Sequence, residues 1–145
     1  QYEISNFGKK GYFSNHNTAY WKNQHYLGIG PSAHSFNGNS RRWNVISNKQ
    51  YIQKMTKSEA YFEVEILTIN QQYNEYIFTS LRTIWGINSG GIKERFGEQI
   101  QTLFLKEVIK WVKKGYVKQV DKVFTLTKTG QIFADRIASD LFIVD

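Results

Sequence analysis

The sequence predicts an α+β chain, in which strands and loops come first and a mainly helical, winged-helix-like module follows. Two long segments, 69–84 and 98–113, place apolar residues three and four positions apart, which is the stripe of an amphipathic helix. Two short apolar segments flank Asp121 and Lys122 as the strands of a β-hairpin do. The resulting order of helix, short helix, longer helix, hairpin and helix is that of a winged helix.

The first part of the chain predicts short strands joined by turns. Residues 1–7 alternate apolar and polar positions as a strand does, and a loop rich in Gly, Lys and Asn follows. Residues 25–36 predict a short buried strand that enters a Gly-Pro turn, where Pro31 disfavours a helix around Gly30. Residues 37–40 predict a second turn.

The later segments predict mainly helices, three of which end at a glycine. A short helix is expected from residue 47, and the alternation in residues 59–67 favours a strand, with a helix as the alternative. The remaining expected helices are 69–84 ended by Gly86, 89–96 ended by Gly97, 98–113 ended by Gly115, and 127–142 capped by Thr127. The core of this module is expected to form around Phe104, Trp111, Phe124 and Phe133.

Composition narrows the possible chemistry of the chain. It has 145 residues, a formal net charge of +7 and no cysteine. This chain therefore supplies no disulfide, thiolate nucleophile or cysteine-ligated metal centre. Residues 1–57 hold eight Lys/Arg against Glu3 alone, whereas residues 58–145 hold eleven residues of each sign. The first part suits an anionic partner, with an acidic neighbouring surface or solvent as the alternative.

All three histidines lie in this basic part, at His16, His25 and His34. Their spacing of nine differs from the i,i+4 spacing of a helical metal pair, and carboxylates do not cluster nearby, so no protein-bound metal site is expected. A histidine in such a place is ordinarily a hydrogen-bonded structural residue. The other interpretation is an axial ligand of haem iron, because Tyr20 and Trp21 follow His16 and can stack on a macrocycle. Composition does not decide between the two.

The segment GIGPSA, residues 28–33, is only loosely similar to a phosphate-binding loop, since no Gly-Lys-Ser/Thr follows it. Its glycines bring backbone amides close to the surface, where they can meet a carboxylate or the edge of a ring. The sequence shows neither the Ser-His-Asp order nor a pair of carboxylates. The chain by itself is therefore not predicted to be a catalyst.

A winged-helix-like module raises the question of nucleic-acid binding. Its third helix, within residues 98–113, carries several lysines, but residues 58–145 are neutral overall. A DNA-binding module gains much of its affinity by neutralising phosphates, and a neutral module is poorly suited to that. The lysines at the helix end complement the helix dipole instead. Nucleic acid is thus not an expected partner, and a nucleic-acid-binding winged helix is kept only as the less favoured alternative function.

Several short motifs together carry a family resemblance. They are YEISNF, HNTAYW and YLGIGPSAHSF, followed by Arg42-x-Asn44, LRTIWGI, an RFG segment and LTKTGQIFAD. Their combination resembles the later part of the oxygen-independent coproporphyrinogen III oxidase-like family of radical S-adenosylmethionine proteins. The element HN-x2-YW is similar to the branch regarded as haem chaperones. The resemblance extends over essentially the whole chain and is most specific in its first 45 residues.

The resemblance implies a longer parent protein with a partial barrel. That barrel would carry a Cys-x3-Cys-x2-Cys motif for a 4Fe–4S cluster, with S-adenosylmethionine beside it. Because the chain lacks cysteine and begins without an initiator Met, we expect it to be cut from such a parent. Residues 1–45 would be the truncated C-terminal edge of the barrel, and residues 46–145 the helical, winged-helix-like C-terminal domain.

The resemblance also assigns candidate residues. His16, Asn17, Tyr20 and Trp21 fall on the haem-associated element, and Gly28, Gly30, Ser32 and Ala33 fall on a Gly-x-Gly-x-Ser/Gly-Ala element expected to pack near S-adenosylmethionine through backbone contacts. The implied function is haem binding and haem trafficking, with haem-receiving proteins as further partners. The alternative is a fragment of a coproporphyrinogen III oxidase, with a porphyrinogen as substrate. Cytoplasmic location is expected, since neither a leader nor a long apolar segment is present.

Overall fold

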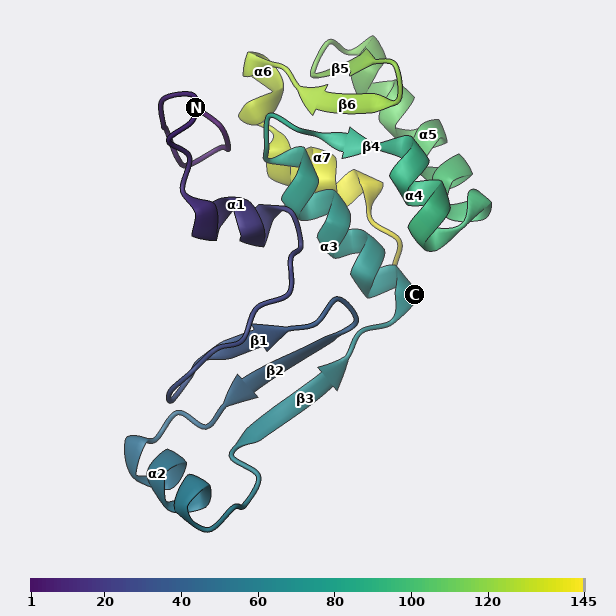
Figure 1. Cartoon of the computed structure of the whole chain (residues 1–145). Coiled ribbons are helices and arrows are strands. Elements are labelled where there is room, and N and C mark those ends of the chain that lie inside the picture. Colours follow the sequence, from purple (N-terminus) through teal and green to yellow (C-terminus); the bar gives the residue numbers. More distant parts are fainter. Residues whose placement is uncertain (145) are drawn as a thin grey trace. The chain divides into compact units, whose positions relative to one another are not determined.

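The structure is a computed structural model, and it describes residues 1–144. The chain forms two compact units, which are described separately (Figure 1). Unit 1 combines residues 1–22 with the chain from residue 69 onward, and unit 2 comprises residues 23–68. The predicted division at residue 45 concerns membership in a parent barrel and stays a prediction.

Unit 1 is mainly helical, and a small sheet lies among its helices (Figure 1). Its elements are α1 (Asn15–Trp21), α3 (Ile69–Leu81), β4 (Ile87–Asn88), α4 (Ser89–Phe96), α5 (Glu98–Lys113), β5 (Val117–Val120), β6 (Val123–Leu126), α6 (Lys128–Gln131) and α7 (Ala134–Leu141). The strands pair antiparallel in the order β4-β6-β5. From α3 to β6 this is the element order of a winged helix.

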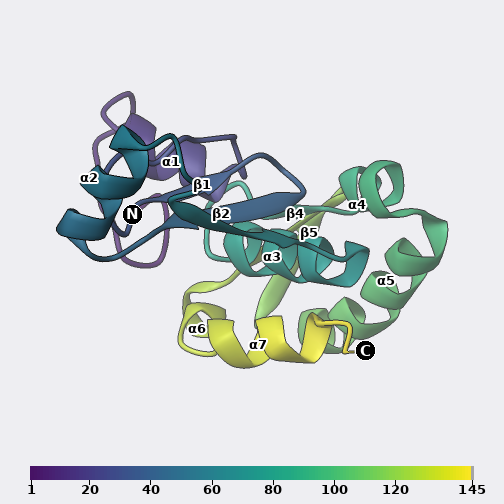
Figure 2. The same ribbon diagram turned by 90° about the horizontal axis from the view of Figure 1, so that it is seen from below.

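The core of unit 1 follows from the apolar stripes of its helices. The helix α7 packs against α3 and α5 (Figures 1 and 2). The expected core residues Phe104, Trp111 and Phe124 are buried, and the rings of Phe104 and Phe124 meet edge to face with centroids 5.3 Å apart. Burying one such side chain contributes about 1.5–3 kcal/mol. Phe133, which was predicted to join them, is 41% exposed, so that prediction is wrong.

Unit 2 is a three-stranded antiparallel sheet with one helix. Its elements are β1 (His34–Phe36), β2 (Ser40–Asn44), α2 (Asn48–Thr56) and β3 (Phe62–Ile66), and the strand order is β1-β2-β3. Among residues 23–68, Leu67 is the one buried apolar side chain, while Ser35 and Asn44 are buried polar residues. Unit 2 is therefore held by its backbone ladder and by polar contacts more than by an apolar core.

The α+β class predicted from the sequence is confirmed, and so are a helix end, a helix cap and a two-residue turn. Gly97 terminates α4, Thr127 caps α6 through its hydroxyl, and Asp121 adopts a φ of +52° in the β5–β6 turn. Asp tolerates this left-handed conformation, which explains a two-residue turn without glycine.

Several segments differ from the prediction. Within residues 25–36, only His34–Phe36 forms a strand, and Leu27 and Ile29, which were expected in a buried strand, are exposed because Tyr26 makes no more than an isolated bridge to Phe36. Residues 1–7 make only an isolated bridge, Glu3 to Thr83, because the backbone turns so that Tyr2 N–H donates to Asn6 O at 3.2 Å. The helix expected to reach Gly86 ends at Leu81. The C-terminal helix is divided into α6 and α7, which leaves Ile132 exposed between them.

Candidate functional site

The candidate haem residues lie on a helix that the sequence analysis did not predict. Residues 15–21 form α1, and the hydroxyl of Ser14 accepts from the N–H of Asn17 at 3.2 Å. Ser at the N-cap satisfies one of the otherwise unpaired N–H groups of the first turn. This cap was the one local signal for a helix, because Asn, Thr and Tyr in the segment are weak helix formers.

The side chains of α1 fall on two faces. His16 and Tyr20 are four positions apart, share one face and are exposed. Asn17 and Trp21 share the neighbouring face and are half-buried. The rings of Tyr20 and Trp21 meet edge to face, with centroids 5.2 Å apart. The helix thus presents an accessible imidazole with aromatic surface beside it, which is what a flat, ring-shaped ligand requires.

Three cations flank this helix along the chain. Lys9 and Lys10 precede α1 and are exposed, and Lys22 caps its C-terminal end. The one acid of residues 1–22, Glu3, is only 2% exposed, and its carboxylate accepts from the N–H of Ser5 at 2.9 Å and from the amide of Asn6. The accessible charge beside α1 is therefore positive, as carboxylate substituents of a ligand would need.

The glycine segment, residues 28–33 of unit 2, is shaped by close backbone approach. A Cβ on Gly28 would lie 2.1 Å from the carbonyl oxygen of His34, so only glycine fits there. Gly30 has a φ of +99°, a left-handed conformation that glycine adopts readily. Ser32 also has a positive φ, of +59°, which is unusual for a residue with a side chain.

The backbone amides of this segment are already used within unit 2. Gly28 N–H donates to the hydroxyl of Ser35 at 3.0 Å, and Gly30 N–H donates to the hydroxyl of Tyr51 at 3.3 Å. The N–H groups of the other two candidate residues donate to Val45 O at 3.1 Å (from Ser32) and to Gly30 O at 3.3 Å (from Ala33). These amides are therefore not free to cradle an anion. The segment offers a ligand a shaped backbone surface and the exposed side chain of Ile29.

Asn44 on β2 fixes the glycine segment through two hydrogen bonds. Its side chain is 1% exposed, and its Nδ2 donates to Gly30 O at 2.8 Å. Its own N–H donates to Ala33 O at 3.0 Å, so a single residue on β2 fixes both ends of the turn. Sequence analysis gave Asn44 only as part of a family motif. A polar side chain buried in a sheet signals such a structural role, but burial is not visible in the sequence.

The two groups of candidate residues belong to different units. The haem-associated residues lie in unit 1, whereas Gly28, Gly30, Ser32 and Ala33 lie in unit 2. The basic excess of residues 1–57 is divided in the same way, with three Lys/Arg in unit 1 and five in unit 2. The sequence had indicated one contiguous region, and it folds as parts of two.

The other two histidines have local roles. The ring of His25 lies against Gly38, where an added Cβ would be 2.9 Å from its Nε2, and it meets Phe36 edge to face. His34 is on β1, opposite Trp43 of β2. Within residues 1–144, no group of three His, Asp or Glu side chains is arranged to hold a metal ion.

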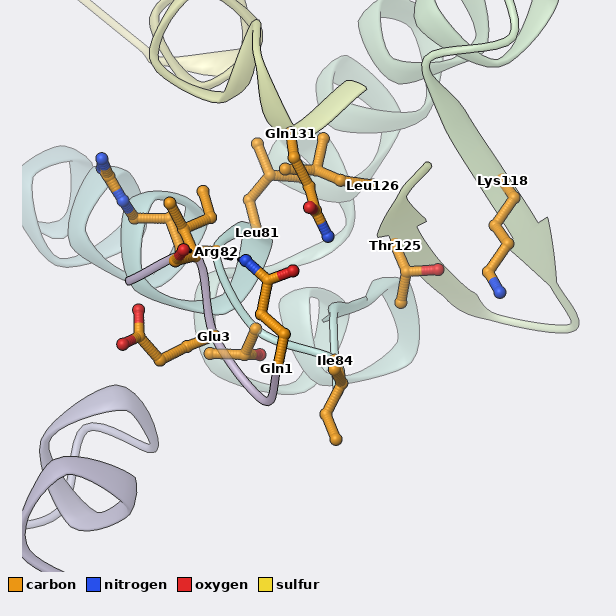
Figure 3. A pocket seen from close by; sticks show the side chains of 11 residues that line it. Gln1, Glu3, Leu81, Arg82, Ile84, Lys118, Thr125, Leu126 and Gln131 are labelled. Carbon is orange, nitrogen blue, oxygen red and sulfur yellow. Dashed lines mark hydrogen bonds between the residues drawn. The ribbon is translucent and has the colours of Figure 1, made fainter. Parts of the chain in front are cut away.

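A cavity of about 130 Å³ lies in unit 1, apart from the candidate residues (Figure 3). The amides of Gln1 and Gln131 point toward one another in it, and Lys118 stands at its side on β5 (Figure 3). The rest of the lining is both apolar, with Ile4, Ile84 and Leu126 among its residues, and polar, with Glu3 and Arg82. It is a small, mixed polar and apolar hollow, and α1 is not part of its described wall.

Comparison with known proteins connects this geometry to a family. A family model described as the HemN C-terminal domain matches residues 67–133. The chain is 33% identical over 138 residues, or 94% of its length, to a protein of Bacillus subtilis named heme chaperone HemW. The chain is therefore similar to part of the HemN/HemW-like proteins. A HemW of Lactococcus lactis is 31% identical over 133 residues, which supports the same likeness.

The likeness is partial in length and clear in fold. The chain spans 36% and 35% of the two HemW proteins, so it covers little more than a third of their length. A solved structure described as "Coproporphyrinogen III oxidase (HemN) from Escherichia coli is a Radical SAM enzyme" matches with a TM-score of 0.64 and 22% identity. That match covers 82% of this chain and 28% of the HemN chain, and it shows a shared fold. The resemblance identified from the sequence motifs is thereby confirmed.

No helix in the part of the chain that the structure describes has the length and apolar character needed to span a bilayer. A shorter likeness extends to mammals: a mouse protein named radical S-adenosyl methionine domain-containing protein 1, mitochondrial, is 59% identical over 34 residues.

Proposed function

We propose that the protein containing this chain binds haem through α1 and passes it to recipient proteins in the cytoplasm. The observation that carries the proposal is the accessible face formed by His16 and Tyr20, in a chain 33% identical over 94% of its length to a protein named a haem chaperone. In this proposal His16 supplies an axial nitrogen to the iron, and Tyr20 and Trp21 contact the macrocycle. Asn17 lies on the side of α1 next to Trp21 and completes the element.

The cations around α1 suit the carboxylates of haem. The propionate groups are anionic, and Lys9, Lys10 and Lys22 are the cations of the same stretch of unit 1. With the acid Glu3 buried and already hydrogen-bonded, no accessible acid of residues 1–22 opposes this charge. We therefore expect haem affinity to fall as ionic strength rises.

S-adenosylmethionine and a 4Fe–4S cluster are cofactors of the proposal for the whole protein. This chain has no cysteine, so the cluster thiolates would have to come from another part of the protein. The glycine segment suits packing against S-adenosylmethionine through its close-lying backbone and through Ile29. It does not suit binding through its N–H groups, because those of all four candidate residues donate within unit 2.

The experiment is a haem titration of the full-length protein and of the 145-residue chain, followed by the Soret band. His16→Ala is expected to weaken binding at least tenfold and to shift the band. His34→Ala is the matched control, because His34 is also exposed but lies on β1 in unit 2. Ligation uses the neutral imidazole, so the band should also weaken on acidification. Equal affinity and an equal spectrum for wild type and His16→Ala would remove His16 from the role.

A second candidate is oxygen-independent oxidative decarboxylation of coproporphyrinogen III by the whole protein. The observation that favours it is the shared fold with the coproporphyrinogen III oxidase of Escherichia coli. Incubation of the reconstituted full-length protein with coproporphyrinogen III separates the two candidates. Formation of protoporphyrinogen would favour the enzyme, and haem binding without turnover would favour the chaperone.

A further inference from the structure

The turn between α3 and β4 holds the indole of Trp85 in a fixed place in unit 1. The hydroxyl of Thr83 donates to Ser80 O at 2.9 Å and accepts from Gly86 N–H at 3.3 Å. Gly86 has a φ of +65°, and a Cβ there would lie 2.2 Å from Phe124 O, so the turn presses against β6. Ile87, the next residue, is fully buried. Trp85 is thus anchored on both sides to the rigid part of unit 1.

Helix α1, in contrast, has no core stripe of its own. None of residues 15–21 is buried, and a helix of this length is not stable in isolation. The residues on either side of α1, Phe13 and Lys22, both contact the indole of Trp85. The ring of Phe13 meets Trp85 edge to face with centroids 6.4 Å apart, and Lys22 Nζ lies 4.8 Å from the centroid of the Trp85 ring.

The N-terminal segment supports this arrangement from behind. Tyr2 is 2% exposed and stacks on Phe13 with centroids 4.5 Å apart. Its backbone is joined to the same turn, because Ile84 N–H donates to Tyr2 O at 3.1 Å and Ile4 N–H donates to Arg82 O at 3.0 Å. Residues 82–86 therefore meet both the segment that precedes α1 and the residue that caps it.

We propose that Trp85 is a positioning residue for α1, and through α1 for the imidazole of His16. Phe13 and Lys22 rest on one indole, so the direction of the helix between them is set by that indole and by the Thr83–Gly86 turn. In this proposal Trp85 does not itself contact a ligand. The effect on haem rests on the proposed function, whereas the effect on α1 does not.

The test uses Trp85→Ala and Trp85→Phe with two readouts, residue-resolved hydrogen exchange and the Soret spectrum of added haem. Trp85→Ala is expected to speed exchange of the amides in residues 15–21 at least tenfold, while the amides of α5 keep the wild-type rate. It is also expected to change the Soret band. Trp85→Phe keeps an aromatic face for Phe13 and Lys22, so it should restore most of both signals. Trp43→Ala, at a half-buried tryptophan of unit 2, is the control.

If Trp85→Ala fails to fold, Lys22→Met takes its place for the hydrogen-exchange readout alone, because it removes the cation from the indole and leaves the turn intact. The Soret band is not used for this variant, since Lys22 is also one of the cations proposed for the propionates. Faster exchange of α1 alone would support the proposal. Unchanged exchange of α1 in Trp85→Ala, or in Lys22→Met where that variant replaces it, would overturn it.

The haem readout separates this proposal from the proposed function. Wild-type protein that binds no haem would defeat the haem proposal, and hydrogen exchange would still decide whether Trp85 positions α1. If haem binding depends on His16 while Trp85→Ala loosens α1 without changing the Soret band, the link from Trp85 to the ligand is wrong.

Discussion

The two units keep their chains ordered by different means. Unit 1 buries a continuous cluster that includes Tyr73, Ile77, Phe104 and Phe124, whereas unit 2 buries Leu67 as its one apolar side chain among residues 23–68. Both units leave large apolar residues exposed, and those of unit 2 include Leu27, Ile29, Ile46, Ile52, Met55, Val64 and Ile66. A sheet with open edges and so little core gains stability when another surface covers it. The comparison indicates that unit 1 has an apolar core of its own, and we expect unit 2 to gain more stability from further contacts.

The largest expected contrast comes from the same substitution made once in each unit. Ile77→Ala empties a fully buried position in α3 and is expected to cost about 2–5 kcal/mol of unfolding free energy. Ile66→Ala removes a side chain that is 80% exposed on β3, and its cost is expected within about 0.5 kcal/mol. Urea unfolding of both variants checks the contrast. Equal losses would show that unit 2 has a core that the described contacts do not reveal.

A smaller effect tests the polar support of unit 2. Asn44→Ala removes the hydrogen bond from Nδ2 to Gly30 O and leaves that buried carbonyl with one donor fewer. The free energy of local opening of residues 28–33 is expected to fall by about 1–3 kcal/mol. The fall should be near the lower limit, because the buried Oδ1 of Asn44 makes no hydrogen bond that the substitution could remove. Hydrogen exchange of the segment measures it, with exposed Asn39→Ala as the matched control. Exchange spread equally over unit 1 would contradict a role confined to unit 2.

The smallest effect concerns a polar group within the core of unit 1. Burial raises the pKa of Tyr73 above its usual range, and its hydroxyl donates to Leu141 O at 3.0 Å. The folded state therefore favours the neutral phenol. This contribution is complete below the unfolded pKa of about 10 and is lost as pH rises from there toward the folded value.

The corresponding variant is Tyr73→Phe. It should cost about 1 kcal/mol at neutral pH, through the lost hydrogen bond. It should also flatten the alkaline loss of stability relative to wild type. Thermal unfolding between neutral and strongly alkaline pH compares the two chains. Parallel stability curves above pH 10 would show that Tyr73 titrates normally.

The same comparison explains how far the sequence could predict the molecule. Unit 1 is rich in local signals: three- and four-residue spacing gave α3 and α5, glycine gave the end of α4, and Thr127 gave a cap. Phe133 was misplaced because an apolar residue in a helical pattern looks the same whether the helix continues or breaks before it. In α1, weak helix formers concealed the helix that Ser14 caps. The role of Trp85 was not predictable, since it depends on partners at positions 13 and 22.

In the glycine segment, the sequence predicted the unusual backbone but not its hydrogen-bond partners. Sequence analysis anticipated that glycine allows an unusual backbone in this segment, but it did not predict that Gly28 makes the close approach and that Gly30 has the positive φ. It also supposed that the amides of the segment are available. Their acceptors, Ser35, Tyr51 and Val45, come from other parts of unit 2, and the sequence alone does not disclose such pairs.

The contact between Lys22 and Trp85 joins residues 63 positions apart, and the whole of unit 2 is looped out between them. Loop-closure entropy opposes such a contact, and short-range contacts within α4, α5 and the β5–β6 hairpin form at lower entropic cost. During folding, residues 69–144 should thus assemble first, and α1 should dock late. The segment that carries His16 is then the last portion of unit 1 to mature and the first to detach under mild denaturant.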